Sequence, residues 1–297
     1  MIGRYADAGD LRRALDDRIR NAARIQGVAH DRLRKEIAFQ RLVARFTAID
    51  TDRWALKGGA ALIWRIGAQV RATRDIDSNW FDDAPNFGPF FDAALATDLN
   101  DAFSFEASQP TELRGEAEGG HRYRMVAFVA GREFAAFHLD INYIENDQRP
   151  VEIVEINVPL LEFMNQSKLR VPMISISQQM SEKLHAVDRR YRSGGSSRPK
   201  DAYDTVLIAQ TYPIPELQTV RESVAETFAL RRNRLPHNPP GLPTAWQPDI
   251  ESYLSNFNID GVSGFEEVAL IWNELWTPVL DDTIEATRWD PSQRQWT

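Results

Sequence analysis

Residues 56–80 read LKGGAALIWRIGAQVRATRDIDSNW, and the interpretation of the whole chain depends on this stretch. Its apolar start predicts a short strand that ends in a Gly-Gly turn. A helix is expected over residues 60–66, where a further glycine ends it. Asp75 and Asp77 follow two positions apart, so on a strand both carboxylates point to the same face of the sheet.

The first half of the stretch has the composition of a phosphate-binding turn. Gly58 and Gly59 allow the backbone to approach a phosphate closely and direct N–H groups toward it. The helix that follows adds the positive end of its dipole to the same anion. Lys57 supplies a cation directly before the turn. These residues therefore predict a site for a nucleoside triphosphate.

The second half of the stretch has the composition of a metal site. Asp75 and Asp77 offer two carboxylates on one strand face, and Mg²⁺ (or Mn²⁺) is a hard cation that prefers oxygen ligands. A third carboxylate is expected at Asp140, on the polar face of the alternating run 133–144. Such a metal site beside a triphosphate predicts phosphoryl transfer.

Outside this stretch, the hydrophobic pattern predicts a mixed α/β first half and a mainly helical second half. Helices are expected over 10–48 (two helices), 89–101, 173–192, 200–210, 216–232 and 264–284. Strands are expected over 103–108, 122–130 and 133–144 and around 152–158. Five prolines mark 236–248 as a loop or linker.

Composition limits the possible classes of protein. The chain has 297 residues, of which 43% are hydrophobic and 26% are charged, as in ordinary globular proteins. It has no cysteine, which excludes disulfides, cysteine zinc sites and a cysteine nucleophile. The net charge of −8 argues against a generic nucleic-acid coat but allows a local basic groove. Because the sequence has neither a membrane-spanning stretch nor a signal peptide, we expect a cytoplasmic protein without membrane contact.

The stretch 56–80 closely resembles the signature of nucleotidyltransferase toxins of the AbiEii/AbiGii type, within the DNA polymerase β-like nucleotidyltransferase superfamily. In that signature, a Lys-Gly-Gly turn and a helix precede the pattern Arg-x-Thr-x-Asp-x-Asp. Arg71 and Thr73 fill its first two positions here, and the two aspartates fill the others. The resemblance is closest to the tRNA-modifying, MenT-like members and covers roughly residues 30–210.

The resemblance also implies functional residues further along the chain. QQMSEKLHAV, at 178–187, matches a family helix whose lysine, here Lys183, would contact nucleotide phosphates. RPKDAYD, at 198–204, matches a later basic–acidic motif, in which Asp201 and Asp204 would act as a base or orient Lys183. The expected catalytic residues are Asp75, Asp77, Lys183, Asp201 and Asp204. The expected nucleotide-binding residues are Lys57, Gly58, Gly59, Arg71 and Thr73. The expected metal ligands are Asp75, Asp77 and Asp140.

For the fold, the resemblance implies an α+β protein. An N-terminal polymerase β-like nucleotidyltransferase domain, a mixed sheet with flanking helices, would span residues 1–160, and a mainly helical domain would span 161–297. The implied function is that of a toxin of a toxin–antitoxin system. It would transfer a nucleoside monophosphate from an NTP to the 3′ end of tRNA, block aminoacylation and growth, and have a cognate antitoxin. Many members have Ser or Thr after Lys-Gly-Gly, where this chain has Ala60 and Ala61, so the preferred nucleotide stays open.

Other functions remain open from the sequence. The same chemistry could modify a protein or a small molecule, and carboxylates with Mg²⁺ also suit a nuclease. A nuclease needs no triphosphate cradle, however, and a silent nucleotide-binding protein would not need all the metal carboxylates. Ser78 is a candidate for regulatory phosphorylation, because a phosphate there would repel the triphosphate. Candidates for tRNA contact are the arginines of 189–192 and 231–234 and the aromatic residues Trp246, Trp272 and Trp276, although the helical spacing of the last two favours the core.

Overall fold

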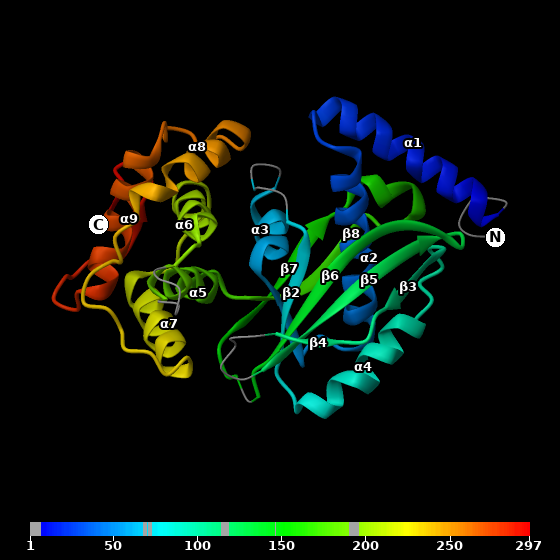
Figure 1. The fold of residues 1–297 in the computed structure, drawn as a ribbon, viewed down its shortest axis with the longest axis horizontal. Coiled ribbons are helices and arrows are strands. Elements are labelled where there is room, and N and C mark those ends of the chain that lie inside the picture. Colours follow the sequence, from blue (N-terminus) through cyan, green and yellow to red (C-terminus); the bar gives the residue numbers. More distant parts are fainter. Residues whose placement is uncertain (1–6, 68–69, 71–72, 114–118, 146, 190–195) are drawn as a thin grey trace. The chain divides into compact units, whose positions relative to one another are not determined.

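A computed structural model describes residues 7–67, 70, 73–113, 119–145, 147–189 and 196–297 (Figure 1). The fold is mixed α+β, with a mixed sheet and many helices. The chain divides into two compact units: unit 1 comprises Met1–Arg65 and Ala72–Met173, and unit 2 comprises Ile66–Arg71 and Ile174–Thr297. None of the helices in the described part of the chain has the length and hydropathy that crossing a membrane requires.

Unit 1 is built on a sheet that mixes parallel and antiparallel neighbours. Its strands are β1 (Trp54–Lys57), β2 (Asp75–Trp80), β3 (Phe103–Ala107), β4 (Thr111–Glu112), β5 (Gly120–Val129), β6 (Arg132–Tyr143), β7 (Val151–Asn157) and β8 (Lys168–Ile174). The strand order is β3-β5-β6-β2-β1-β8-β7, and β4 also pairs with β5. At the centre, β1 runs antiparallel to β2, and β2 runs parallel to β6. The central strands β2 and β6 bring together residues that are far apart in the sequence.

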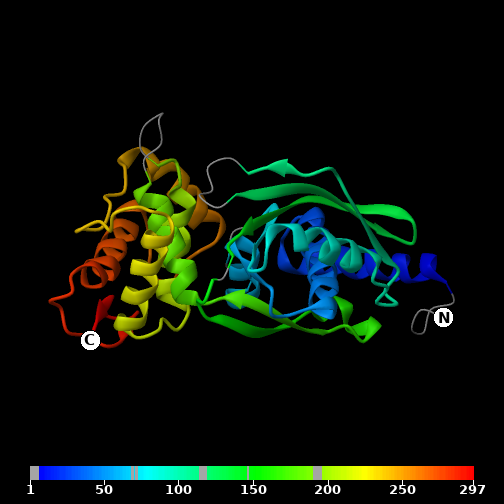
Figure 2. The ribbon, with the colours of Figure 1, turned by 90° about the horizontal axis from the view of Figure 1, so that it is seen from below.

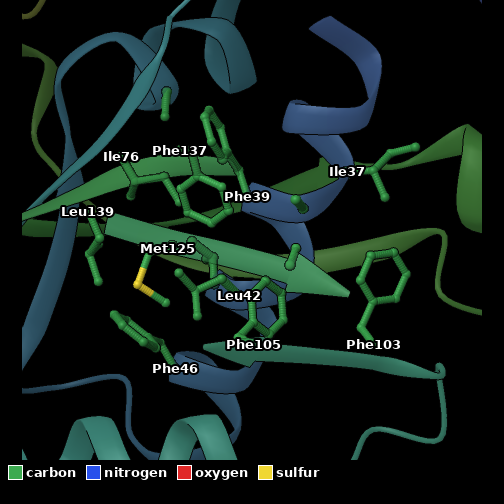
Figure 3. Close-up of a cluster of buried hydrophobic side chains, with 14 of the residues drawn as sticks. Ile37, Phe39, Leu42, Phe46, Ile76, Phe103, Phe105, Met125, Phe137 and Leu139 are labelled. Carbon is green, nitrogen blue, oxygen red and sulfur yellow. The ribbon is translucent and has the colours of Figure 1, made fainter. Parts of the chain in front are cut away.

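Helices cover one face of this sheet. They are α1 (Ala8–Gln26), α2 (His30–Ile49), α3 (Gly58–Ile66) and α4 (Ala84–Ala96), with a short 3₁₀ turn η1 (Pro159–Met164). Figure 2 shows α2 and α4 lying against the sheet. Alternate strand residues such as Ile76 and Leu139 point into the core that these helices close (Figure 3). The rings of Phe39 on α2 and Phe137 on β6 meet edge to face, with centroids 4.9 Å apart. Because side chains alternate along a strand, the intervening polar residues lie on the opposite face.

Unit 2 is mainly helical. Its elements are α5 (Ile176–Asp188), α6 (Pro199–Thr211), α7 (Leu217–Leu230), a 3₁₀ turn η2 (Thr244–Trp246), α8 (Gln247–Asn256), α9 (Phe265–Leu280) and a small ladder of β9 (Trp289–Asp290) and β10 (Gln295–Trp296). Ser175 caps the start of α5, and its hydroxyl accepts a hydrogen bond from the Gln178 N–H. Trp272 and Trp276 are fully buried, as their helical spacing predicts.

The structure departs from the expected elements where proline occurs. β8, which includes Pro172, was not predicted as a strand, and its last two residues overlap the start of the helix expected over 173–192. It pairs with β1 in parallel, with Leu56 opposite Met173. The expected domain boundary at residue 160 therefore lies before β8, whereas the compact units divide after Met173. The α8 helix, with Pro248 in its first turn, begins at the end of the proline-rich segment 236–248, for which the prolines predict a loop or linker.

Candidate active site

Four charged side chains from neighbouring strands form a row across the polar face of the sheet in unit 1. The strand register pairs Lys57 of β1 with Asp77 of β2, Asp77 with Asp140 of β6, and Asp140 with Arg122 of β5. We call Lys57, Asp77, Asp140 and Arg122 the charged row. Directly opposed residues of neighbouring strands point to the same face. The row therefore places two carboxylates between two cations.

Asp75 lies beside the charged row, two positions before Asp77 on β2. Both carboxylates are partly exposed, whereas Ile76 between them is buried in the core. This is the arrangement that the Asp-x-Asp spacing predicts. His138 of β6 is opposite Asp75, and its Nδ1 lies 3.2 Å from the Asp75 Oδ1. The two aspartates therefore present oxygen ligands on one accessible face of the sheet.

The Gly-Gly turn is packed tightly against this face. Gly58 has a φ of +66°, and a Cβ added there would lie 2.3 Å from the Asp77 Oδ2, closer than atoms can approach. A Cβ at Gly59 would lie 2.9 Å from the Thr73 Oγ1. Thr73 donates its own hydroxyl to the Asp75 carbonyl at 3.1 Å. Gly58 is thus required by its close contact with Asp77 and by its left-handed backbone conformation, whereas Gly59 is required by its close contact with Thr73, just before β2.

We expect Gly58→Ala to lower nucleotide transfer by about 100-fold, because the new methyl group displaces the Asp77 carboxylate. Gly27 offers a matched control. Its φ is +67°, but a Cβ there would meet nothing within 4 Å. Gly27→Ala should lower the free energy of unfolding by about 1 kcal/mol, because alanine is forced into a left-handed backbone conformation. It should not lower the rate of nucleotide transfer. The variants are compared by thermal unfolding and by the rate of label transfer. Equal transfer rates in both would show that the contact with Asp77 is unimportant.

Arg122 is a site residue that the sequence analysis did not identify. Its Nε donates to the Asp140 Oδ1 at 2.7 Å, and its Nη2 donates to the Asp140 Oδ2 at 2.6 Å. Arg122 and Asp140 therefore form a bidentate, charge-assisted ion pair. Hydrogen bonding to Asp140 raises the pKa of the Arg122 guanidinium, burial opposes that rise, and the negative charges of Asp140, Asp75 and Asp77 support it. Arg122 therefore interacts electrostatically with all three expected metal carboxylates.

The donor set at Asp75 and Asp77 fits a hard divalent cation. Carboxylate oxygens are the ligands that Mg²⁺ and Mn²⁺ prefer, and the close packing of Gly58 on Asp77 places the Gly-Gly turn beside them. Within the described residues, no group of three His, Cys, Asp or Glu side chains is arranged to hold a metal ion. Asp140, the expected third ligand, uses both carboxylate oxygens to accept hydrogen bonds from Arg122.

A second charged cluster lies in unit 2, where α5 packs on α6. The Lys183 Nζ donates to the Asp201 Oδ1 at 3.1 Å and to the Asp204 Oδ2 at 2.8 Å. All three side chains are buried. The second Asp201 oxygen, Oδ2, lies 3.7 Å from the Arg198 Nη1. The two aspartates share one helix face, as their spacing predicts, and both contact Lys183. The structure therefore brings together the three expected catalytic residues of this half.

We expect Lys183→Met to lower the free energy of unfolding by about 3–5 kcal/mol, because it leaves two carboxylates buried without their cation. Adding Asp204→Asn should recover much of that stability, since an amide carries no charge to bury. If the Lys183 charge serves the reaction, transfer stays lost in the double variant. Urea unfolding and the transfer assay measure the two effects separately. Recovery of transfer together with stability would show that Lys183 is purely structural.

Several other expectations are resolved by burial. Ser78 is 1% exposed, so the proposed phosphorylation there is wrong: a kinase cannot reach a side chain that lies on the core face of β2 with Ile76 and Trp80. Ala60 and Ala61 pack in the core of unit 1. His185 is buried against the Phe228 ring and hydrogen-bonds to Asn233, which agrees with a structural role. The tryptophans considered for base stacking, Trp246, Trp272 and Trp276, are all buried.

The remaining expected residues lie partly outside the described part of the chain. Arg71, the expected nucleotide-binding arginine, is outside the described residues. The same holds for most of the 189–192 segment. In the second arginine segment, Arg232 and Arg234 are exposed, and the Arg234 Nη2 contacts the His237 Nε2 at 2.8 Å. These two arginines stay candidates for contact with a polyanion.

Comparison with known proteins gives a family match over most of the chain. The model of the family described as nucleotidyl transferase AbiEii toxin, type IV toxin–antitoxin system, matches residues 41–287. This match extends well beyond residue 210, where the recognised resemblance ended, and includes most of unit 2. No curated protein matches the chain.

Comparison with solved structures gives matches of low identity whose TM-scores lie below 0.5. MenT4, a nucleotidyltransferase toxin from Mycobacterium tuberculosis H37Rv, is 14% identical with a TM-score of 0.46, and the alignment covers 80% of this chain and 98% of that one. A putative nucleotidyltransferase from H. pylori is also 14% identical, with a TM-score of 0.43 and coverage of 87% and 100%. An antigenic nucleotidyltransferase-like protein from Paracoccidioides brasiliensis is 16% identical, with a TM-score of 0.40 and coverage of 78% and 96%.

Proposed function

We propose that this chain, which belongs to the AbiEii family of nucleotidyl transferase toxins of type IV toxin–antitoxin systems, transfers a nucleoside monophosphate from an NTP to the 3′ end of tRNA. Membership of the family makes the chain a nucleotidyltransferase and implies an antitoxin as its partner. The finer proposal is supported by one observation above all: Gly58 of the phosphate-binding turn packs directly on Asp77. A triphosphate that contacts this turn comes close to the strand that bears both carboxylates.

The donor nucleotide is proposed to bind through its phosphates. The backbone of Gly58 and Gly59 would contact the triphosphate at the start of α3, where the helix dipole favours an anion. Lys57 would add a positive charge from the end of β1. Thr73, packed beside Gly59, offers a hydroxyl in place of those that Ala60 and Ala61 lack. These residues hold the triphosphate so that its α-phosphate is presented to an acceptor.

The transfer step requires charge stabilisation and a correctly placed acceptor. Asp75 and Asp77 would hold Mg²⁺ or Mn²⁺, which when bound offsets the charge that develops on the phosphate oxygens and lowers the pKa of the attacking hydroxyl. The acceptor hydroxyl gives up its proton to solvent and its oxygen forms a bond to the α-phosphorus. The bond between the α-phosphorus and the oxygen that bridges to the β-phosphorus breaks, and pyrophosphate leaves. In unit 2, Lys183 is proposed to contact phosphate, while Asp201 and Asp204 fix its position through the two hydrogen bonds described above.

The tRNA acceptor is supported by the resemblance to the tRNA-modifying members of the family. A nucleotide added to the 3′ end removes the hydroxyl to which an amino acid is attached, so aminoacylation and growth would stop. A chain with a net charge of −8 needs a local positive surface to bind RNA. Exposed arginines such as Arg232 and Arg234 would contribute to such a surface.

The acceptor is tested by incubating the purified chain with Mg²⁺, total tRNA and each α-labelled NTP in turn. A parallel sample uses tRNA whose 3′ ribose has been oxidised by periodate, which removes the acceptor hydroxyls. We expect label in intact tRNA and none in oxidised tRNA. Label in protein or small molecules would overturn the tRNA acceptor while keeping the reaction class. Unlabelled tRNA fragments would instead indicate a nuclease.

A further inference from the structure

The pair of Arg122 and Asp140 changes the charge that an incoming triphosphate meets. The negative charges of Asp75, Asp77 and Asp140 would together repel an anion strongly. Arg122 neutralises one of them at 2.6–2.7 Å and lies at the end of the charged row opposite Lys57. The polar face of the sheet therefore has a cation at each end of the row, with the carboxylate of Asp77 between them and Asp140 already paired.

The Arg122 guanidinium retains capacity for a second anion. Of its five N–H donors, the pair with Asp140 uses only two. The Arg122 side chain is 42% exposed, whereas the Asp140 side chain is 9% exposed. The carboxylate thus lies against the sheet, and the guanidinium that it anchors reaches solvent. A planar guanidinium held in this way is pre-organised for phosphate oxygens, which it can bind with parallel N–H donors.

Asp140 is correspondingly less suited to coordinating a metal ion. Both of its oxygens accept short hydrogen bonds from Arg122, and the described residues hold no group of three potential metal ligands. Recruiting Asp140 to a metal would require these two charge-assisted hydrogen bonds to break, or a cation to bind beside a guanidinium. Both alternatives are costly, because the Asp140 carboxylate itself is buried and its hydrogen bonds to Arg122 are charge-assisted.

We propose that Arg122 binds the triphosphate, and that Asp140 positions Arg122 instead of acting as a metal ligand. This inference rests on the proposed function, because it assumes that a triphosphate binds at the charged row. It replaces the expectation of a three-carboxylate metal site with two metal-binding carboxylates, Asp75 and Asp77, and a fixed arginine. Arg122 and Lys57 would then contact the phosphates from opposite ends of the row.

The test measures binding without any acceptor or turnover. Mn²⁺ binding to the full chain is followed by electron paramagnetic resonance, and binding of a non-hydrolysable α,β-methylene NTP is followed by calorimetry. Arg122→Gln should weaken triphosphate binding by about tenfold or more, the usual effect of losing a charge-assisted hydrogen bond. It should strengthen Mn²⁺ binding in the absence of nucleotide, because a neighbouring positive charge is removed.

Asp140→Asn separates the two roles of the carboxylate. If it positions Arg122, the variant weakens triphosphate binding and leaves the affinity for Mn²⁺ within about threefold of the unmodified chain. The double variant Arg122→Gln, Asp140→Asn contains no unpaired charge, which guards against misfolding, and should behave like Arg122→Gln toward the triphosphate. A loss of Mn²⁺ binding of about tenfold or more in Asp140→Asn would overturn the inference, as would unchanged triphosphate binding in Arg122→Gln.

The unmodified chain distinguishes failure of this inference from failure of the proposed function. If the unmodified chain binds neither Mn²⁺ nor the NTP analogue, the proposed donor site itself is wrong. If it binds both and the Arg122 and Asp140 variants show the pattern of a three-carboxylate metal site, only the role assigned to Arg122 is wrong. Glu106→Gln on β3, an exposed residue on the same face, serves as a charge-matched control and should change neither binding constant.

Discussion

Replacement of Asp77 by asparagine should lower nucleotide transfer by about 1,000-fold or more, and Asp75→Asn should do the same. Both residues lie on the accessible face of β2, and the metal that they would hold supplies several kcal/mol of transition-state stabilisation. The side chain is almost unchanged in size, so the contact of Asp77 with Gly58 is retained while one ligand charge is lost. The rate of transfer from α-labelled NTP measures the effect.

The fold should survive these two substitutions. Neither carboxylate belongs to the core; the buried residue between them is Ile76. We expect the melting temperature to stay within about 2 °C of that of the unmodified chain. Mn²⁺ binding should fall in both variants and persist in the Glu106→Gln control. Full transfer activity in a folded Asp77→Asn chain would show that the metal site lies elsewhere.

Asp101→Asn should destabilise unit 1 by about 3–5 kcal/mol, the second large effect. Asp101 is fully buried and accepts hydrogen bonds from the Arg41 Nε at 2.7 Å and the Arg45 Nη2 at 2.8 Å. Both arginines come from α2, and Arg45 also donates to the Phe103 carbonyl at 2.7 Å. The carboxylate thus links α2 to the start of β3. Without its charge, two guanidinium groups are left in the interior without the counter-ion that Asp101 supplies.

Urea unfolding of the full chain measures this cost, with Asp98→Asn as the matched control. Asp98 is an exposed aspartate near the same turn, and its Oδ1 accepts only a local hydrogen bond from the Asn100 N–H in the described structure. An asparagine oxygen can accept the same bond, so the control should change stability by less than about 0.5 kcal/mol. Equal effects of the two substitutions would contradict a structural role for the buried cluster.

The same cluster predicts a dependence of stability on pH. Burial acts to raise the pKa of the Asp101 carboxyl, but the hydrogen bond from Arg45 and the charges of both arginines outweigh burial and lower it. A lowered pKa in the folded state contributes stability at pH values above about 3.9, the ordinary value for aspartate, and this contribution is lost as the pH falls through the folded-state pKa. The stability difference between the unmodified chain and Asp101→Asn should therefore shrink in acid.

The local signals in the sequence were sufficient for the centre of the fold. A Gly-Gly turn, a short apolar helix and alternate aspartates each have a conformational meaning within a few residues. They predicted β1, α3 and β2 and the shared face of Asp75 and Asp77. The helical pair Asp201 and Asp204 could be placed on one face for the same reason.

Long-range pairing could not be predicted in this way. β8 is a strand because it pairs with β1, although Pro172 lowers its intrinsic preference for a strand. Arg122 has no distinguishing neighbours in the sequence. Its role follows from the register of β5 against β6, which places it opposite Asp140, and no local pattern sets that register. The buried partnership of Asp101 with α2 depends on tertiary packing in the same manner.

The most direct test of the central claim compares transfer from α-labelled and γ-labelled NTP to tRNA in the presence of Mg²⁺. Transfer of a nucleoside monophosphate moves the α-phosphorus to the acceptor and releases the γ-phosphorus as part of pyrophosphate. The account predicts label in tRNA from the α-labelled donor, none from the γ-labelled donor, and neither with Asp77→Asn. Label from the γ position, or α-label transfer that persists in Asp77→Asn, would contradict nucleotidyl transfer at the charged row.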